Sequence, residues 1–209
     1  MELILIRHGE TIWNKEGRVQ GSSDIDLNDV GFHQVQQLAL SLRDHHIHSI
    51  YSSPLMRAKK TAEIINQYHN APICLESDLM EMDQGDFEGL TYQELMACEK
   101  EFLVKWISDP ASVRMPNGES LHELQSRAWK VIEGIIIKPD NALCVSHSFT
   151  IASILCKIKN IRLSEFRSVH VDTASKTIVK FENGSASIKC LNDRTHLKAD
   201  GPNKPKLNK

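Results

Sequence analysis

The chain has 209 residues, with 25 lysines and arginines against 27 aspartates and glutamates, and a formal net charge of −2. This balance creates no broad positive field, which argues against nucleic acids and membrane surfaces as partners. Hydrophobic residues make up 41% of the chain and charged residues 25%, as in ordinary globular proteins, and the length suits one domain with a sizeable core. An anion would therefore have to be bound by a local cluster of cations.

Scattered cysteines and short apolar runs bear on the cellular compartment. The five cysteines are odd in number and form no C-x-x-C pair, which favours reduced thiols over a disulfide framework or a zinc knuckle. The first apolar run, residues 3–6, is too short for the core of an export signal, and no run is long enough to span a bilayer. We therefore expect a cytoplasmic protein.

The predicted elements alternate between strands and helices. Apolar runs predict four strands, at 2–6, 47–53, 71–76 and 142–146. Apolar side chains recur at helical spacing over three further segments, 35–42, 55–65 and 121–135. Most of these strands lack polar alternation, as expected when both faces are covered. We therefore predict an α/β fold, a three-layer αβα sandwich around a mostly parallel sheet.

Residues 85–117 interrupt this alternation. They mix helix formers with turns that contain proline and glycine, so we expect a small helical insertion at about 89–118, beside the sheet. Immediately after it, Ser120 and Glu123 have the spacing of a capping box and predict the start of the longest helix.

The C-terminal part of the chain predicts a hairpin and then a tail. Asn183-Gly184 separates two segments of strand character, 176–181 and 185–190, which predicts a hairpin at the sheet edge. The segment 198–209, KADGPNKPKLNK, is polar and predicts a disordered tail. Residues 1–197 are expected to form a single domain.

Polar side chains follow three of the predicted strands. Arg7 and His8 follow the first strand, Arg57 lies shortly after the second, and His147 follows the fourth. Ligands of parallel sheets collect at this edge, so we expect these residues to meet although they span 140 residues of chain. Two guanidiniums and two imidazoles suit a dianionic phosphate. Gly9 is expected to let the backbone approach that ligand.

The motifs around these residues resemble those of the histidine phosphatase superfamily, the phosphoglycerate-mutase-like group. The signature of that family resembles RHGET at 7–11, and its second-arginine motif resembles SSPLMRAKKTA at 52–62. Its acid motif resembles LMEMDQGDFEGLTYQEL at 79–95, and its second-histidine motif resembles VSHS at 145–148. The resemblance covers almost the whole chain and favours the phosphatase branch, which includes α-ribazole phosphatases.

The resemblance implies a covalent mechanism at His8. That residue would attack phosphorus and form a phosphohistidine, which water then hydrolyses. Glu81 would be the general acid that protonates the leaving oxygen. Asp83, Asp86 and Glu88 lie nearby, and the motif selects Glu81 among these carboxylates. No metal ion or other cofactor is implied, because arginines supply the positive charge.

The same resemblance implies a set of groups that hold phosphate. Arg7, Arg57 and His147 would bind the non-bridging oxygens, where charge is stabilised during transfer. Asn14 would add a neutral hydrogen bond. Ser148 stands where the family usually has glycine, and its side chain would either narrow the pocket or donate a hydrogen bond to the substrate.

Some further residues have weaker signals. Gln84, at a position that varies with substrate among relatives, suggests a polar leaving-group pocket. His170 is a candidate for substrate contact. Trp106 is expected to serve packing, and the histidine-rich segment 44–49 is expected to be an exposed helix end, not a metal site.

Three functions compete at this point. The first is a metal-independent phosphomonoesterase for a small phosphorylated metabolite. Because relatives are often dimers, we expect this enzyme to be a homodimer. The second is a cofactor-dependent phosphoglycerate mutase, which needs more cations than the Lys100, Lys105 and Arg114 of the insertion. The third is a catalytically silent protein that binds phospho-ligands, against which the intact His8 and Glu81 argue.

Overall fold

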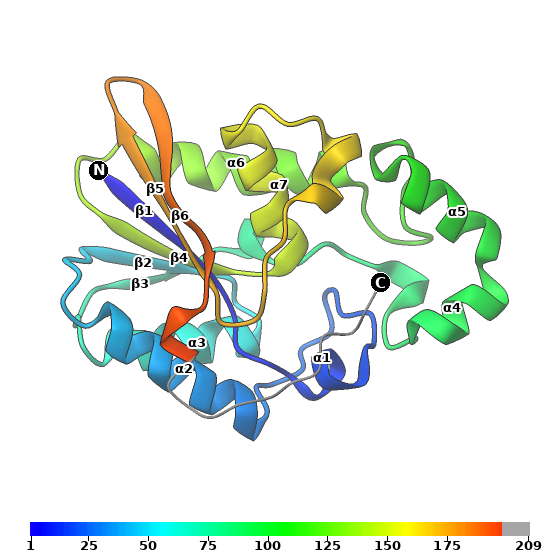
Figure 1. The fold of residues 1–209 in the computed structure, drawn as a ribbon, viewed down its shortest axis with the longest axis horizontal. Coiled ribbons are helices and arrows are strands. Elements are labelled where there is room, and N and C mark those ends of the chain that lie inside the picture. Colours follow the sequence, from blue (N-terminus) through cyan, green and yellow to red (C-terminus); the bar gives the residue numbers. More distant parts are fainter. Residues whose placement is uncertain (198–209) are drawn as a thin grey trace.

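A central sheet of six strands organises residues 1–197, which are the residues that the computed structural model describes (Figure 1). The predicted tail, 198–209, lies outside the described residues. The strands are β1 (Glu2–Arg7), β2 (Ser49–Ser52), β3 (Ile73–Leu75), β4 (Ala142–Ser146), β5 (Lys176–Glu182) and β6 (Ser185–Asp193). Their order is β3-β2-β4-β1-β5-β6. The first four run parallel, and β5 and β6 are antiparallel to their neighbours.

Helices cover both faces of the sheet, which confirms the predicted αβα architecture. The helices on one face are α2 (Asp29–Leu42) and α3 (Met56–Asn66), and those on the other are α6 (Leu121–Ile136) and α7 (Ser148–Ile158). Within β1, Ile4 and Ile6 pack on the first pair, whereas Leu3 and Leu5 pack in the other core. The strand is apolar throughout because each face meets a helix layer.

The local signals at 120–123 and 183–184 both act as predicted. The hydroxyl of Ser120 accepts from the backbone N–H of Glu123, and the Glu123 carboxylate accepts from the N–H of Ser120, so the capping box begins α6. Asn183 and Gly184 have φ of 51° and 74°, as a tight hairpin between β5 and β6 requires. The hairpin is therefore confirmed, with β6 at the edge of the sheet.

Between β3 and α6 the chain forms short helices beside the sheet. They include η1 (Ser77–Leu79), η2 (Gly85–Phe87), α4 (Tyr92–Cys98), α5 (Lys100–Ser108) and η3 (Pro110–Ser112). In Figure 1, α4 and α5 lie beyond one end of the strands, with α1 (Ile12–Glu16) nearby. No helix within residues 1–197 is long and apolar enough to cross a membrane.

Gly9 and Gly31 fix the loop after β1 against the start of α2. A Cβ on Gly9 would lie 2.5 Å from the carbonyl oxygen of Gly31, and one on Gly31 would lie 2.0 Å from that of Glu10. The expected approach of the Gly9 backbone to a ligand stays a prediction, because these contacts concern only the packing on α2. The missing side chain allows the loop that carries His8 to pack on α2.

This packing predicts that Gly31→Ala lowers the free energy of unfolding by about 1–3 kcal/mol or more, because backbone must move to admit the methyl group. Gly134→Ala is the matched control, since a Cβ at Gly134 in α6 meets nothing within 4 Å. That control should gain up to about 1 kcal/mol from higher helix propensity. Chemical denaturation of both variants measures the difference, and equal stabilities would contradict the packing role of Gly31.

Candidate active site

The site lies at the carboxyl ends of β1 and β4. The imidazole rings of His8, directly after β1, and His147, directly after β4, have centroids 5.1 Å apart. Arg57, in the first turn of α3, is fully buried and donates from Nε to Nδ1 of His147 at 3.3 Å. Parallel β1 and β4 pair in register, so residues 139 positions apart in sequence meet at one edge.

His8 is held in one neutral tautomer. Its Nδ1 lies 2.7 Å from the carbonyl oxygen of Gly9. A carbonyl oxygen can only accept, so Nδ1 carries the proton and Nε2 keeps a lone pair. Burial and the nearby charges of Arg57 and Arg7 hold the pKa of His8 well below its usual value. An uncharged imidazole with a free lone pair is the form that can attack phosphorus.

Arg57 is a buried cation with neutral partners. Its Nη1 and Nη2 donate to the carbonyl oxygens of Ser23 and Gly21, each at 2.7 Å. Within residues 1–197, none of its hydrogen bonds goes to a carboxylate. Burial lowers the pKa of Arg57 to about 10, which still leaves it charged at neutral pH. Glu81, Asp24 and Glu88 act on this charge through space only, so a bound anion would add the direct partner that it lacks.

Arg7 offers an unused donor to the same site. Its Nη1 donates to the carbonyl oxygen of Val171 at 2.7 Å, which orients the guanidinium. Its Nε is shielded from solvent and has no partner among the described residues. Burial lowers the pKa of Arg7, with Glu81 acting in the opposite direction. An orphaned donor on a cation is what an oxyanion would satisfy.

His147 has protein partners on both ring nitrogens. Because Nδ1 accepts from Arg57, Nε2 carries the proton and donates to Oγ of Ser53 at 2.8 Å. Burial, Arg57 and His8 hold the pKa of His147 well below its usual value. The side-chain oxygen of Gln20 lies 2.7 Å from the same Nε of Arg57 when its amide nitrogen faces Thr11. Gln20 and His147 therefore compete for this one N–H donor. Ser53 lies in the motif SSPLMRAKKTA at 52–62, whereas the contact of Gln20 was not anticipated from the sequence, because a neutral polar side chain in a loop carries no distinctive pattern.

Glu81 is buried and oriented by the start of α7. Its two carboxylate oxygens accept from the backbone N–H groups of Phe149 and Thr150, each at 3.1 Å. Glu81 also interacts favourably with the charges of Arg7 and Arg57. This interaction raises the pKa values of both arginines, but burial lowers them by more. The carboxyl group predicted as general acid therefore lies beside the positive cluster.

An arginine on α6 braces the segment that carries Glu81. Arg127 donates from Nη2 to the carbonyl oxygen of Glu81 at 2.9 Å and from Nη1 to that of Met80 at 2.8 Å. Its Nε donates to Oε1 of Glu119 at 2.7 Å. Sequence analysis missed this brace, because Arg127 has no motif and lies on a helix between apolar positions.

Asn14 and Ser148 lie at the opening of the site. The side-chain oxygen of Asn14 accepts from the N–H of Thr11 at 3.1 Å, so its amide N–H groups are left for a ligand. The hydroxyl of Ser148 makes only a long contact of 3.4 Å, to the carbonyl oxygen of Val171. Both residues line a cavity of about 690 Å³ that also borders Arg7 and Glu81.

The far wall of this cavity is apolar. Gln84 and the exposed His170 do line the cavity. Its lining also includes a group of aromatic side chains, Phe87, Phe102, Trp106, Phe149 and Phe166. Polar side chains such as Gln84, Arg18 and Asp172 line the same cavity, so the polar leaving-group pocket inferred from Gln84 stays a prediction. Trp106 does pack, stacking on Phe149 at 5.9 Å, but it also lines the cavity.

Residues 3–194 match the profile of the histidine phosphatase superfamily (branch 1). The chain belongs to this family. It is 34% identical over 199 residues to phosphoserine phosphatase 1 of Hydrogenobacter thermophilus, with 94% of each chain covered. Among solved structures, it superposes on Bacillus stearothermophilus YhfR with a TM-score of 0.89 and 28% identity, covering 94% of this chain and 99% of the other. A putative α-ribazole-5′-P phosphatase from Escherichia coli gives a TM-score of 0.85 and 26% identity, with 93% and 97% covered.

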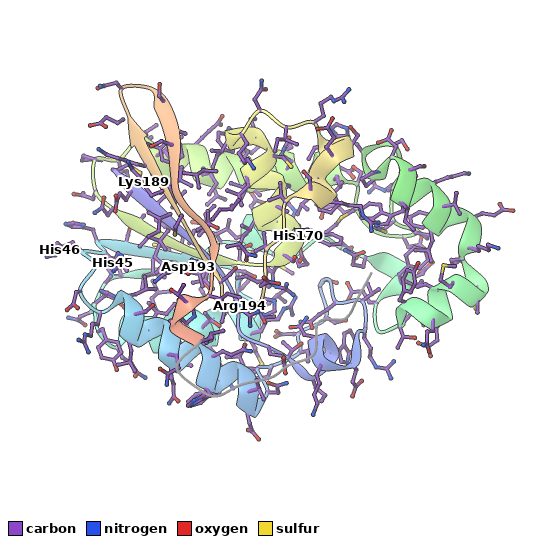
Figure 2. All side chains as sticks on the ribbon, viewed as in Figure 1. His45, His46, His170, Lys189, Asp193 and Arg194 are labelled. Carbon is purple, nitrogen blue, oxygen red and sulfur yellow. The ribbon has the colours of Figure 1, made fainter. Side chains whose placement is uncertain are left out.

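The predicted family and enzyme class are thus confirmed, and the site of this histidine phosphatase gathers every residue that the resemblance implicated. The histidine-rich segment lies elsewhere. Figure 2 shows His45 and His46 near the ends of β2 and β3, far from His170. His46 is exposed and His45 half-buried, and both follow the end of α2 at Leu42.

The lowered pKa values of His8 and His147 predict how stability depends on pH. Below pH 6.5 both imidazoles become protonated in the unfolded chain but stay neutral in the fold. The unfolded state then binds more protons, so the free energy of unfolding should fall as the pH decreases below about 6.5. The slope is at most about 1.4 kcal/mol per pH unit for each histidine.

Urea unfolding between pH 7.5 and 5.5 measures this slope. A double variant, His8→Gln with His147→Gln, should show a shallower dependence than the parent protein over this interval. Identical slopes for the two proteins would mean that the buried imidazoles are not the groups that titrate on unfolding.

Proposed function

We propose that this histidine phosphatase is a metal-independent phosphomonoesterase that hydrolyses a small phosphorylated metabolite through a phosphohistidine at His8. The observation that carries this proposal is the neutral imidazole of His8, with Nδ1 committed to the Gly9 carbonyl, beside two guanidiniums. The likenesses to phosphoserine and α-ribazole phosphatases support a small phosphate ester as substrate.

In the first step, the Nε2 lone pair of His8 forms the P–N bond while the ester P–O bond breaks. The ring then carries positive charge, which the Nδ1–H···O contact to Gly9 stabilises. The departing oxygen takes a proton from the carboxyl group of Glu81. In the second step, water attacks phosphorus, its proton returns to Glu81, and the P–N bond breaks to regenerate His8 with free phosphate.

Cations stabilise the charge on the transferring group in both steps. The free Nε of Arg7 and the buried charge of Arg57 are preorganised for the non-bridging oxygens. Asn14 and Ser148 would add neutral donors from the opening of the cavity. His147 donates to Ser53 in the free protein, so a direct bond to phosphate requires that this partner be exchanged.

The covalent step predicts a labelled intermediate. Rapid mixing with a ³²P-labelled ester, followed by an alkaline quench, should trap phosphohistidine on the protein. His8→Ala should abolish the label and reduce turnover at least about a thousandfold, because the nucleophile is removed. His46→Ala, which changes an exposed histidine away from the site, should leave both unchanged.

The fate of the label distinguishes the competing functions. Release as inorganic phosphate supports hydrolysis, whereas transfer mainly to a phosphoglycerate would establish a mutase. Binding of the ester with neither label nor turnover would establish a silent protein.

The role of Glu81 predicts a dependence on the leaving group. Glu81→Gln should lower kcat for an alkyl phosphate about 10²–10⁴-fold, because an alkoxide needs a proton to depart. For 4-nitrophenyl phosphate, whose leaving group is stable as an anion, the loss should be far smaller. Arg127→Met should show the same selectivity in weaker form, since it loosens the segment that carries Glu81.

Arg162→Met removes an exposed ion pair with Glu165 and serves as the matched control. A Glu81→Gln loss of equal size for both esters would exclude proton donation to the leaving oxygen.

A further inference from the structure

The acid and the apolar wall of the cavity are physically joined. The backbone N–H of Phe149 holds one carboxylate oxygen of Glu81 at 3.1 Å. The ring of the same Phe149 stacks on Trp106 at 5.9 Å and meets Phe166 edge to face at 5.1 Å. Glu81 and these three aromatic residues line the same cavity, so a leaving oxygen that receives its proton from Glu81 would lie in the cavity that the aromatic cluster borders.

The charged side chains that line the cavity either have hydrogen-bond partners within the protein or are exposed to solvent. Arg18 donates to Glu16 at 2.6 Å and to the carbonyl oxygen of Gly89 at 2.7 Å. Arg167 and His170 are exposed, and the carboxylate of Asp172 accepts from Nδ2 of Asn192 at 2.9 Å. Apart from Arg7, which faces the phosphate site, the described lining thus holds no uncommitted cation deep in the cavity for a carboxylate of the substrate.

The insertion completes the apolar enclosure. Phe102 and Leu103 of α5 line the cavity, and Phe102 packs edge to face on Phe87 at 4.9 Å. Ile107, also on α5, borders the cavity while 48% exposed. The volume of about 690 Å³ is in the range of sites that enclose a drug-sized ligand, and it far exceeds the need of a phosphate group.

We infer that the substrate is a phosphate monoester of an alcohol whose body is apolar, aromatic or aliphatic, and that this body fills the wall formed by Phe149, Trp106 and α5. This inference rests on the proposed phosphatase function. Transfer of apolar surface from water into the cavity would then supply the selectivity. Each buried methylene group would raise kcat/KM about fourfold.

A series of n-alkyl phosphates from ethyl to octyl tests this inference, because the leaving alcohols have nearly equal acidity and differ only in apolar surface. Below the micelle concentration, kcat/KM should rise about threefold to fourfold per methylene until the cavity is filled. Hexyl phosphate and benzyl phosphate should both exceed phosphoserine and glycerol phosphate at least about tenfold.

Two exposed residues of α5 provide matched variants. Ile107→Asn places a polar group on the cavity wall and should flatten the dependence on chain length. Val104→Asn changes a residue that is 58% exposed and does not line the cavity, so it should leave the dependence intact. Phe149→Ser should reduce the dependence most, and the α5 pair keeps the test decisive if that variant does not fold.

The outcomes separate this inference from the function beneath it. Turnover with a flat alkyl series, or with phosphoserine preferred over hexyl phosphate, would overturn the apolar substrate and leave the phosphatase standing. Absence of turnover and of labelled histidine with every ester would overturn both.

Discussion

The buried guanidinium of Arg57 is the constraint around which the site is arranged. It lies in the first turn of α3, wholly removed from solvent, and its bonds go to two carbonyl oxygens and a ring nitrogen. Carbonyl dipoles orient such a cation but do not neutralise it. The same charge acts with burial to hold His8 and His147 neutral, as their lowered pKa values show. One buried charge with no hydrogen-bonded carboxylate among the described residues thus acts on both the proposed anion site and the proposed nucleophile.

The backbone around β1 turns this electrostatic preparation into geometry. The loop after the strand packs so closely on α2 that neither Gly9 nor Gly31 can carry a side chain. His8 is therefore presented from a rigid strand end, and its proton is fixed by the carbonyl of the next residue. If His8 acts as the proposed nucleophile, a side chain held in this way loses little freedom on attack, which is how orientation contributes to catalysis.

The cavity divides recognition between two chemistries. Charged and polar groups near the sheet edge line one part of it, whereas its apolar wall comes from the insertion, from Phe149 of α7 and from the segment before β5. Glu81 stands between them, held by α7 and braced through Arg127.

The sequence by itself determined the sandwich, the edge hairpin, the capped start of α6 and the motif residues, because each of these rests on short-range periodicity, turn chemistry or residue order. The family resemblance followed from the same local patterns. Only the tertiary structure decided which partners surround those residues. Gln20 and Arg127 reach the site through folding of distant segments, and no local pattern marks them. The apolar nature of the cavity was likewise hidden, because an aromatic side chain on a helix looks the same in sequence whether it meets the core or a ligand.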